Sequence, residues 1–304
     1  MRGAETTILR CAGAAALGLS VIVAAGTLAG AAPPPLDHSG YRLVWADEFD
    51  GAAGALPRPH WFFFDGWGAV KWRDAHYTRE DATLDGRGRL VLRARLDGGV
   101  LKTSYLQTYD WKVPRARWTT FGPGPGTYIE ARVNVTGLEA GGLWFAFWLF
   151  DPSDTYDGNP ATGSEIDVVE YLVSAGKPSS WTKNLPHGTL NHFHVANHWG
   201  KAAGQSRTQL IDAAAHGVNL RDGGFHSFGV EWQTDRLIYY LDGRPVWETR
   251  DGVSTSDEHA LMLSLEYDQG PGDVWGLDET IMDHAAKLPA AVLIDHVRVY
   301  ARKP

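Results

Sequence analysis

Cysteine is almost absent from this sequence: Cys11 is the only one among 304 residues. A disulfide-stapled fold and thiol catalysis are therefore excluded for the rest of the chain. Basic residues are also in the minority, with 28 Lys and Arg against 36 Asp and Glu, and they form no blocks. A net charge of −8 without a basic block argues against nucleic acid or an anionic membrane surface as the main partner.

Long apolar and helical stretches are missing after residue 31. No segment there is apolar enough to span a bilayer, and helical periodicity is weak. The 35 Gly and 16 Pro divide the chain into short pieces, whereas aromatic residues are abundant, with 13 Trp, 11 Tyr and 11 Phe. This composition predicts a turn-rich globular protein with an ample core and excludes disordered, coiled-coil and collagen-like chains.

The first residues have the pattern of a secretory signal peptide. Arg2 and Arg10 form a positively charged start, residues 12–28 are apolar and small, and Ala-Gly-Ala at 29–31 matches a cleavage site. A membrane anchor is the alternative interpretation, but a stretch so rich in Ala and Gly would bind a bilayer weakly. Cys11 lies inside this leader, so the mature chain contains no thiol.

The predicted organisation is a signal peptide at 1–31, a short N-terminal spacer at 32–40 and a single domain at 41–304. No internal repeat and no later linker divides the domain. We therefore expect a secreted, extracellular and monomeric protein with no membrane segment in its mature form.

Ten short runs in the domain have the composition and alternation of β-strands, and Gly, Asp, Asn and Pro separate them. Strands at this spacing predict an all-β fold, a sandwich or jelly roll. Its first and last strands, 43–49 and 294–300, should pair because domain termini tend to lie close together. A helical turn or two is expected only at 209–215. The predicted strands are 41–45, 90–95, 128–135, 143–150, 165–172, 188–199, 226–232, 237–241, 260–267 and 292–301.

The strand that begins Glu-Ile-Asp-Val-Val-Glu carries the strongest chemical signal. Side chains alternate between the faces of a strand, so Glu165 and Asp167 point one way and the apolar residues between them point the other way. Strict alternation would bury Glu170. One extra residue at Val168-Val169, a β-bulge, returns Glu170 to the acidic face.

Three carboxylates on one face can perform acid–base chemistry. Neighbouring negative charge raises the pKa of at least one carboxyl group, which gives a protonated acid beside an ionised base. That pairing is what cleavage of a glycosidic bond requires. A solvated acidic edge or a calcium site is the alternative, although a row of acids beside β-branched core residues is costly without a function.

The acidic strand resembles the signature of glycoside hydrolase family 16 in its bulged, laminarinase-like form, E-x-D-x-x-E. Further segments resemble motifs of that family in the same order, so the resemblance covers nearly the whole domain. They are LVWADEF at 43–49, TFG at 120–122 with YIEAR at 128–132, GLWFAFWL at 142–149, FH at 225–226 with VEW at 230–232, YLDG at 240–243 and IDHVRVY at 294–300.

This resemblance implies a concanavalin-like jelly roll of two antiparallel sheets with a concave substrate cleft, and a retaining endo-glycosidase. It implies that Glu165 is the nucleophile, that Glu170 is the general acid and base, and that Asp167 tunes the protonation of both. Retention needs the two carboxyl groups about 5–5.5 Å apart, and a bulged strand can meet that distance.

A second polar face is predicted on the following strand, where His192, His194 and His198 share one parity. A wall of the substrate cleft is favoured over a metal site, because no zinc-binding frame such as H-E-x-x-H accompanies the histidines. His198 begins a His-Trp-Gly sequence similar to the laminarinase "HYG", and Asn191 or His192 is the alternative occupant of that position. His192 and His198 are therefore candidate substrate-binding residues.

Four tryptophans are candidate sugar platforms, because an indole face packs well on the apolar face of a sugar ring. Trp144 and Trp148 share strand parity, so both face the cleft or both face the core. Trp275 lies in a Gly-rich loop that resembles the family's "WGG" loop, and Trp72 lies in another loop near the expected cleft. Trp232 belongs to a framework motif and is expected in the core.

Two departures from the family pattern bear on the substrate. Residues 159–164 replace a laminarinase Trp-Pro, and Glu266 introduces an acid where the family segment "LNLAVGG" is apolar. A β-1,3- or mixed-linked β-glucan is the first expected substrate. The alternatives are a β-galactan such as agar or carrageenan, transglycosylation by the same residues, and a noncatalytic glucan-binding lectin, which would typically lose one of the glutamates.

No cofactor is required for this chemistry, and a polysaccharide is the expected partner. The resemblance also implies a structural calcium between the first and last strands, for which Glu48 and Asp295 are the candidates. Ordinary surface acids are the alternative interpretation of both residues.

Overall fold

The computed structural model describes residues 36–64, 66–67, 75–109, 122–151, 165–174, 190–200, 205–255, 259–268, 275, 277 and 281–304. The predicted signal peptide, with Cys11, and the loop residue Trp72 lie outside the described residues. Within the described ranges, no helix combines the length and apolar character that crossing a membrane would need.

Strands dominate the described residues, and the helical segments among them are short 3-10 turns. The 3-10 turns are η1 (His38–Gly40), η2 (Arg79–Asp81), η5 (Ala213–His216) and η6 (Ile281–Lys287). The strands are β1 (Tyr41–Asp47), β2 (Phe62–Phe63), β3 (Gly66–Trp67), β4 (Ala75–Tyr77), β5 (Ala82–Leu84), β6 (Leu90–Asp97), β7 (Val100–Gln107), β8 (Thr127–Asn134), β9 (Leu143–Phe150), β10 (Glu165–Leu172), β11 (His192–Trp199), β12 (Gln205–Asp212), β13 (His226–Trp232), β14 (Leu237–Leu241), β15 (Arg244–Thr249), β16 (Ala260–Tyr267) and β17 (Ala290–Arg302).

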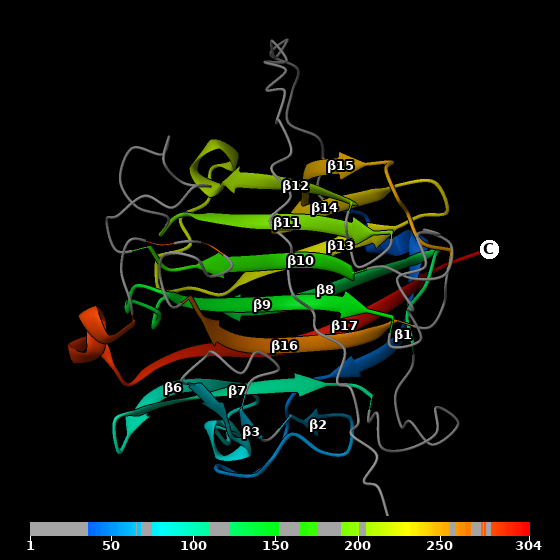
Figure 1. The fold of residues 1–304 in the computed structure, drawn as a ribbon. Coiled ribbons are helices and arrows are strands. Elements are labelled where there is room, and N and C mark those ends of the chain that lie inside the picture. The colour runs from blue at the N-terminus through cyan, green and yellow to red at the C-terminus, as the bar shows by residue number, and fades with distance from the viewer. Residues whose placement is uncertain are drawn as a thin grey trace, which may run out of the picture.

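Two antiparallel sheets stack face to face, as Figure 1 shows. The first sheet has the order β12-β11-β10-β9-β16-β7-β2. The second has the order β15-β14-β13-β8-β17, and β17 then pairs with β1 along one half and with β6 along the other. The predicted all-β jelly roll of two antiparallel sheets is confirmed.

Alternation along the strands decides which side chains lie between the sheets. On β9, Phe145, Phe147 and Leu149 are fully buried in this core, whereas Trp144 and Trp148 are partly exposed on the opposite face. Burial of one such aromatic or leucine side chain stabilises the fold by about 1.5–3 kcal/mol. A one-residue slip would exchange the two faces, so this alternation fixes the register of the central strand.

The first and last strands pair, as the sequence predicted. β1 and β17 run antiparallel from the Tyr41–Arg302 pair to the Asp47–Val297 pair. Figure 1 shows β1 beside the C-terminal half of β17 on the second sheet. This pairing joins the two ends of the domain in the second sheet, which lies behind the sheet that contains the acidic strand.

Residues 209–215 are only partly helical, so that prediction was wrong for their first half. Residues 205–212 form β12, and the 3-10 turn begins only at Ala213, after Asp212 accepts a hydrogen bond from the Ala214 amide at 2.9 Å. β12 is an edge strand with mostly exposed side chains. Its polar sequence therefore lacks the apolar alternation from which a strand is predicted.

Candidate active site

The acidic strand β10 contains the predicted bulge. Against β9, Asp167 pairs with Trp148 but Val169 pairs with Phe147, so Val168 is the extra residue. Val168 and Val169 are both buried in the core between the sheets. Because two successive residues point inward there, Glu170 returns to the outer face that Glu165 and Asp167 already occupy.

The three carboxylates differ in their exposure. Glu165 and Glu170 are partly exposed, whereas Asp167 between them is only 4% exposed. The neighbouring pair on β9 is Ala146 opposite Glu170 and Trp148 opposite Asp167. The outer face therefore offers two accessible carboxyl groups on either side of a buried one, with a small side chain beside Glu170.

β11 brings two histidines to the carboxylates. Glu165 pairs with His198 and Glu170 pairs with His194, and Nε2 of His198 lies 3.2 Å from Oδ2 of Asp167. Burial by itself lowers the pKa of His198. The contact with Asp167 and the charges of Glu165 and Glu170 outweigh burial and raise that pKa to about 9. His198 is therefore a cation at neutral pH and partly compensates the acidic face.

The surroundings of Glu170 favour its protonated form. Burial raises its pKa well above the usual value, and the negative charge of Asp167 is the next cause. His198 acts in the opposite direction, and Glu165 and Glu266 raise the pKa further. A carboxyl group whose charged form is disfavoured in this way keeps its proton to a higher pH than an ordinary glutamic acid does.

The middle histidine of the row, His194, is packed against tryptophan. His194 is 1% exposed, and burial followed by the nearby charge of His192 lowers its pKa to about 3. Its ring lies 4.7 Å from the ring of Trp275, and Trp275 packs edge-on against Trp144 at 5.4 Å. His194 is therefore a neutral group beside Glu170. The sequence placed it on the polar face but did not single it out, because parity alone does not rank three histidines.

The candidate substrate residues do not all lie near the carboxylates. His198 and Trp148 adjoin Asp167, whereas His192 lies at the far end of β11, with Nε2 3.6 Å from Oδ1 of Asp212. Trp275 is 4% exposed and offers little surface to a ligand. Of the three tryptophan candidates that the structure describes, Trp148 has the best position to contact substrate beside the acidic strand.

The residues proposed for calcium do not fit a cation site. Both oxygens of Glu48 accept hydrogen bonds from the guanidinium of Arg298, each at 2.8 Å. Asp295 is bound by Arg132 at 2.9 Å and contacts His296 at 3.1 Å. The negative charges that would attract Ca²⁺ are already compensated by arginine side chains, so we derive no role for a metal from these two residues.

One group in the described part of the chain does have metal-ligand spacing. Donor atoms of Glu165, Asp167 and His198 lie within 4.8 Å of one another. Among the described residues, the row of His192, His194 and His198 does not form such a group. The contact of His198 with Asp167 instead gives this cluster an ion pair of its own.

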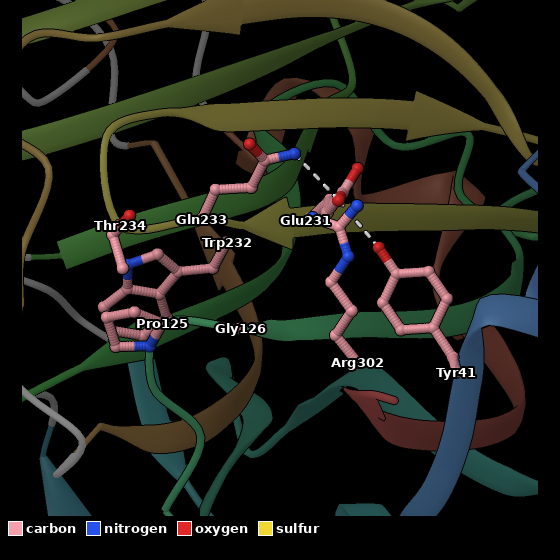
Figure 2. Close-up of a pocket in the computed structure, with 8 residues that line it drawn as sticks. All are labelled: Tyr41, Pro125, Gly126, Glu231, Trp232, Gln233, Thr234 and Arg302. Carbon is pink, nitrogen blue, oxygen red and sulfur yellow. Dashed lines mark hydrogen bonds between the residues drawn. The ribbon is translucent and has the colours of Figure 1, made fainter. Parts of the chain in front are cut away.

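The pocket in Figure 2, of about 260 Å³, belongs to the second sheet and not to the acidic strand. Glu231 in this pocket accepts hydrogen bonds from Tyr41 at 2.7 Å and from Gln233 at 2.9 Å. Trp232 is fully buried and donates its indole N–H to the carbonyl of Ser254, as expected of a framework residue. These contacts hold the fold together and offer no second carboxylate for acid–base chemistry.

Three comparisons place the chain among known proteins. Residues 125–262, which include β10 and β11, match the family model of Glycosyl hydrolases family 16. A β-glucanase from Rhodothermus marinus is 26% identical over 93% of this chain and 92% of its own length. A glucan endo-1,3-β-glucosidase from Cryptopygus antarcticus is 28% identical over 67% of this chain and 68% of its own. The solved structure of an endo-β-1,3-glucanase from Pyrococcus furiosus matches 86% of this chain and 95% of that chain, with a TM-score of 0.60 and 25% identity.

Proposed function

Since this chain belongs to glycosyl hydrolase family 16, we propose that it is a retaining endo-glycosidase that cuts a β-1,3- or mixed-linked β-glucan. The bulge of β10 carries the proposal, because it sets Glu165, Asp167 and Glu170 on one face of the sheet. The names of the relatives support a β-glucan as the substrate. We also propose that residues 1–31 direct secretion, which fits a polymeric substrate outside the cell.

The proposed reaction has two steps. The carboxylate of Glu165 attacks the anomeric carbon, the bond from that carbon to the leaving oxygen breaks, and Glu170 gives its proton to that oxygen. In the second step, Glu170 takes a proton from water, the water oxygen attacks the same carbon, and Glu165 leaves as a carboxylate. Each step inverts the configuration at the anomeric carbon, so the two steps together retain it. Glu170 gives up one proton in the first step and regains one in the second, so it ends protonated.

The electrostatics of the site support this division of roles. The raised pKa of Glu170 keeps a proton available for the leaving group. The cation at His198 lies across from Glu165 on the neighbouring strand and favours the ionised form of a nucleophile. Asp167 connects the two, since it contacts His198 and raises the pKa of Glu170.

A reducing-sugar screen tests the substrate. The wild-type protein should release reducing ends from laminarin or lichenan, and not from agarose or carrageenan. Activity on agarose alone would overturn the glucan substrate and keep the chemistry. Tight binding to a glucan with no turnover would support a lectin instead. Glu170→Gln serves as the inactive control, because glutamine cannot donate a proton to the leaving group.

Azide rescue tests the nucleophile. Glu165→Ala should abolish turnover of an activated aryl glycoside, and azide should restore turnover with a glycosyl azide as the product. Glu248→Ala is the matched control, since Glu248 is an exposed glutamate of β15 on the other sheet. Normal turnover by Glu165→Ala without azide would contradict the assignment.

A further inference from the structure

Glu266 on β16 lies on the same outer face as the catalytic carboxylates. Trp144 on β9 is its partner across the strands, and the next pair on the same face of the sheet is Ser264 with Ala146. Ala146 in turn pairs with Glu170 on β10. On this face of the sheet, Glu266 is therefore in the row next to the one that contains Glu170, and its charge raises the pKa of Glu170.

Both carboxylate oxygens of Glu266 are hydrogen-bonded. The hydroxyl of Tyr77 donates to Oε2 at 3.1 Å, and the hydroxyl of Ser264 donates to Oε1 at 2.8 Å. Ser264 also accepts the indole N–H of Trp148 at 3.3 Å. These four side chains, which we term the indole anchor, come from β4, β16 and β9.

The chemistry of the groups fixes the direction of each bond in the indole anchor. An ionised carboxylate only accepts, and an indole N–H only donates. Ser264 must therefore donate to Glu266, and its lone pairs are then available to Trp148. Ser264 is fully buried, so its hydroxyl has no bulk water with which to exchange this arrangement.

Trp148 is the exposed end of the anchor. Its side chain is partly exposed, it pairs with Asp167 across the strands, and its ring packs edge-on against Tyr105 at 6.0 Å and 88°. The hydrogen bond to Ser264 and the contact with Tyr105 hold the indole from two directions. Such an indole is a rigid apolar surface beside the reacting carboxylates.

We propose that Glu266 is a positioning residue for substrate: through Ser264, and with Tyr77, it fixes the indole of Trp148 as a sugar-stacking surface next to Asp167. This inference rests on the proposed function, because it assigns a sugar subsite to that reaction. It also accounts for Glu266, a residue by which this chain departs from the apolar family segment. A stacking surface binds the ground state and the transition state alike, so its loss raises KM and leaves kcat nearly unchanged.

A double-mutant cycle on laminarin tests the inference. Trp148→Ala should raise KM about tenfold, the order expected for one lost aromatic contact, with kcat within about twofold. Glu266→Ala should raise KM in the same direction. If Glu266 acts through Trp148, the double variant should be no worse than Trp148→Ala alone. Additive effects of the two substitutions, or an unchanged KM in Glu266→Ala, would overturn the proposal.

Matched variants separate positioning from a general loss of stability. Tyr77→Phe removes one donor to Glu266 and should raise KM, whereas Tyr240→Phe removes an equivalent 2.9 Å bond to Glu231 on the other sheet and should not. Glu266→Gln keeps one acceptor oxygen, so it should recover part of the loss if Glu266→Ala folds poorly. Equal KM for both tyrosine variants would contradict the proposal.

The test of the indole anchor and the test of the proposed function can fail independently of each other. Hydrolysis of laminarin by the wild-type protein tests the reaction, and the coupling between Glu266 and Trp148 tests the anchor. Should the wild-type protein act on another glycan in the screen, the same cycle is measured on that glycan. A turnover-competent protein with no coupling would retain the function and refute the positioning role.

Discussion

Nε2 of His198 lies 3.2 Å from Oδ2 of Asp167, which joins the central acid of β10 to the neighbouring strand β11. Asp167 is 4% exposed, so its charge is costly unless a cation lies close by. His198, with a pKa of about 9, supplies that cation near neutral pH. The acidic face is therefore a coupled set of charges and not a row of independent carboxylates.

The ion pair of His198 with Asp167 should make the stability of the protein depend on pH in the alkaline range. The pKa of His198 is about 9 in the folded protein and about 6.5 in the unfolded chain. Its contribution to the free energy of unfolding is thus complete below pH 6.5 and is lost as the pH rises through 9. In His198→Gln, the melting temperature should depend less on pH between 6.5 and 9. An equal change in His216→Gln, outside the acidic face, would contradict this origin.

His194 should act in the acidic range. Its folded pKa of about 3 lies below the unfolded value of about 6.5, so the unfolded chain binds the proton first as the pH falls. Its contribution is present above pH 6.5 and is lost progressively toward pH 3. In His194→Met, the melting temperature should therefore depend less on pH between 6.5 and 3. If the melting temperature of that variant falls with pH as steeply as that of the wild-type protein, His194 is not the cause of the fall.

The pH profile of kcat/KM should shift in opposite directions in two variants. Asp167→Asn removes a charge that raises the pKa of Glu170, so the alkaline limb should move to lower pH. His198→Gln removes a cation that lowers the same pKa, so that limb should move to higher pH. Within the described part of the chain, the charged and titratable groups that face Glu170 are Glu165 and Asp167 on β10, His194 and His198 on β11, and Glu266 on β16. Shifts in the same direction would contradict the assignment of that limb to Glu170.

Two glycine variants should separate backbone strain from crowding against Trp199, the last residue of β11. Gly217 and Gly252 both have positive φ, of 74° and 62°. A Cβ at Gly217 meets nothing within 4 Å, whereas one at Gly252 lies 2.0 Å from Cδ2 of Trp199. Gly217→Ala should lower the free energy of unfolding by about 1 kcal/mol, and Gly252→Ala by about 1–3 kcal/mol more. Urea titration of the two variants measures the difference, and equal losses would mean that Trp199 moves aside freely.

Removal of metal should have no effect. Glu48 and Asp295 are bound by Arg298 and Arg132, and neither is arranged as a calcium ligand. Dialysis against EDTA should therefore leave both the melting temperature and the turnover of laminarin unchanged. A fall in melting temperature that calcium restores, and magnesium does not, would show that these residues rearrange around a bound ion.

The sequence by itself determined the strands and the acidic face. β9, β10, β13, β14 and β16 begin and end at the residues that alternation predicts, and the bulge at Val168 follows from the same parity. The strand bounds and the bulge could be predicted from the sequence because the two-residue period of a strand is local. Neighbouring residues in the chain decide which side chains share a face. The polar edge strand β12 was not predicted, because an exposed edge has no apolar face to produce the pattern.

Only the tertiary structure decided which partners these residues meet. The sequence did not show that His198 contacts Asp167, that Glu48 is bound by Arg298, or that Tyr77 holds Glu266 across 189 positions of the chain. Such contacts depend on the order and register of strands in the sheets, and many orders are compatible with one pattern of alternation. Local periodicity thus places the carboxylates on one face, whereas packing of distant strands sets their charge, their neighbours and the indole beside them.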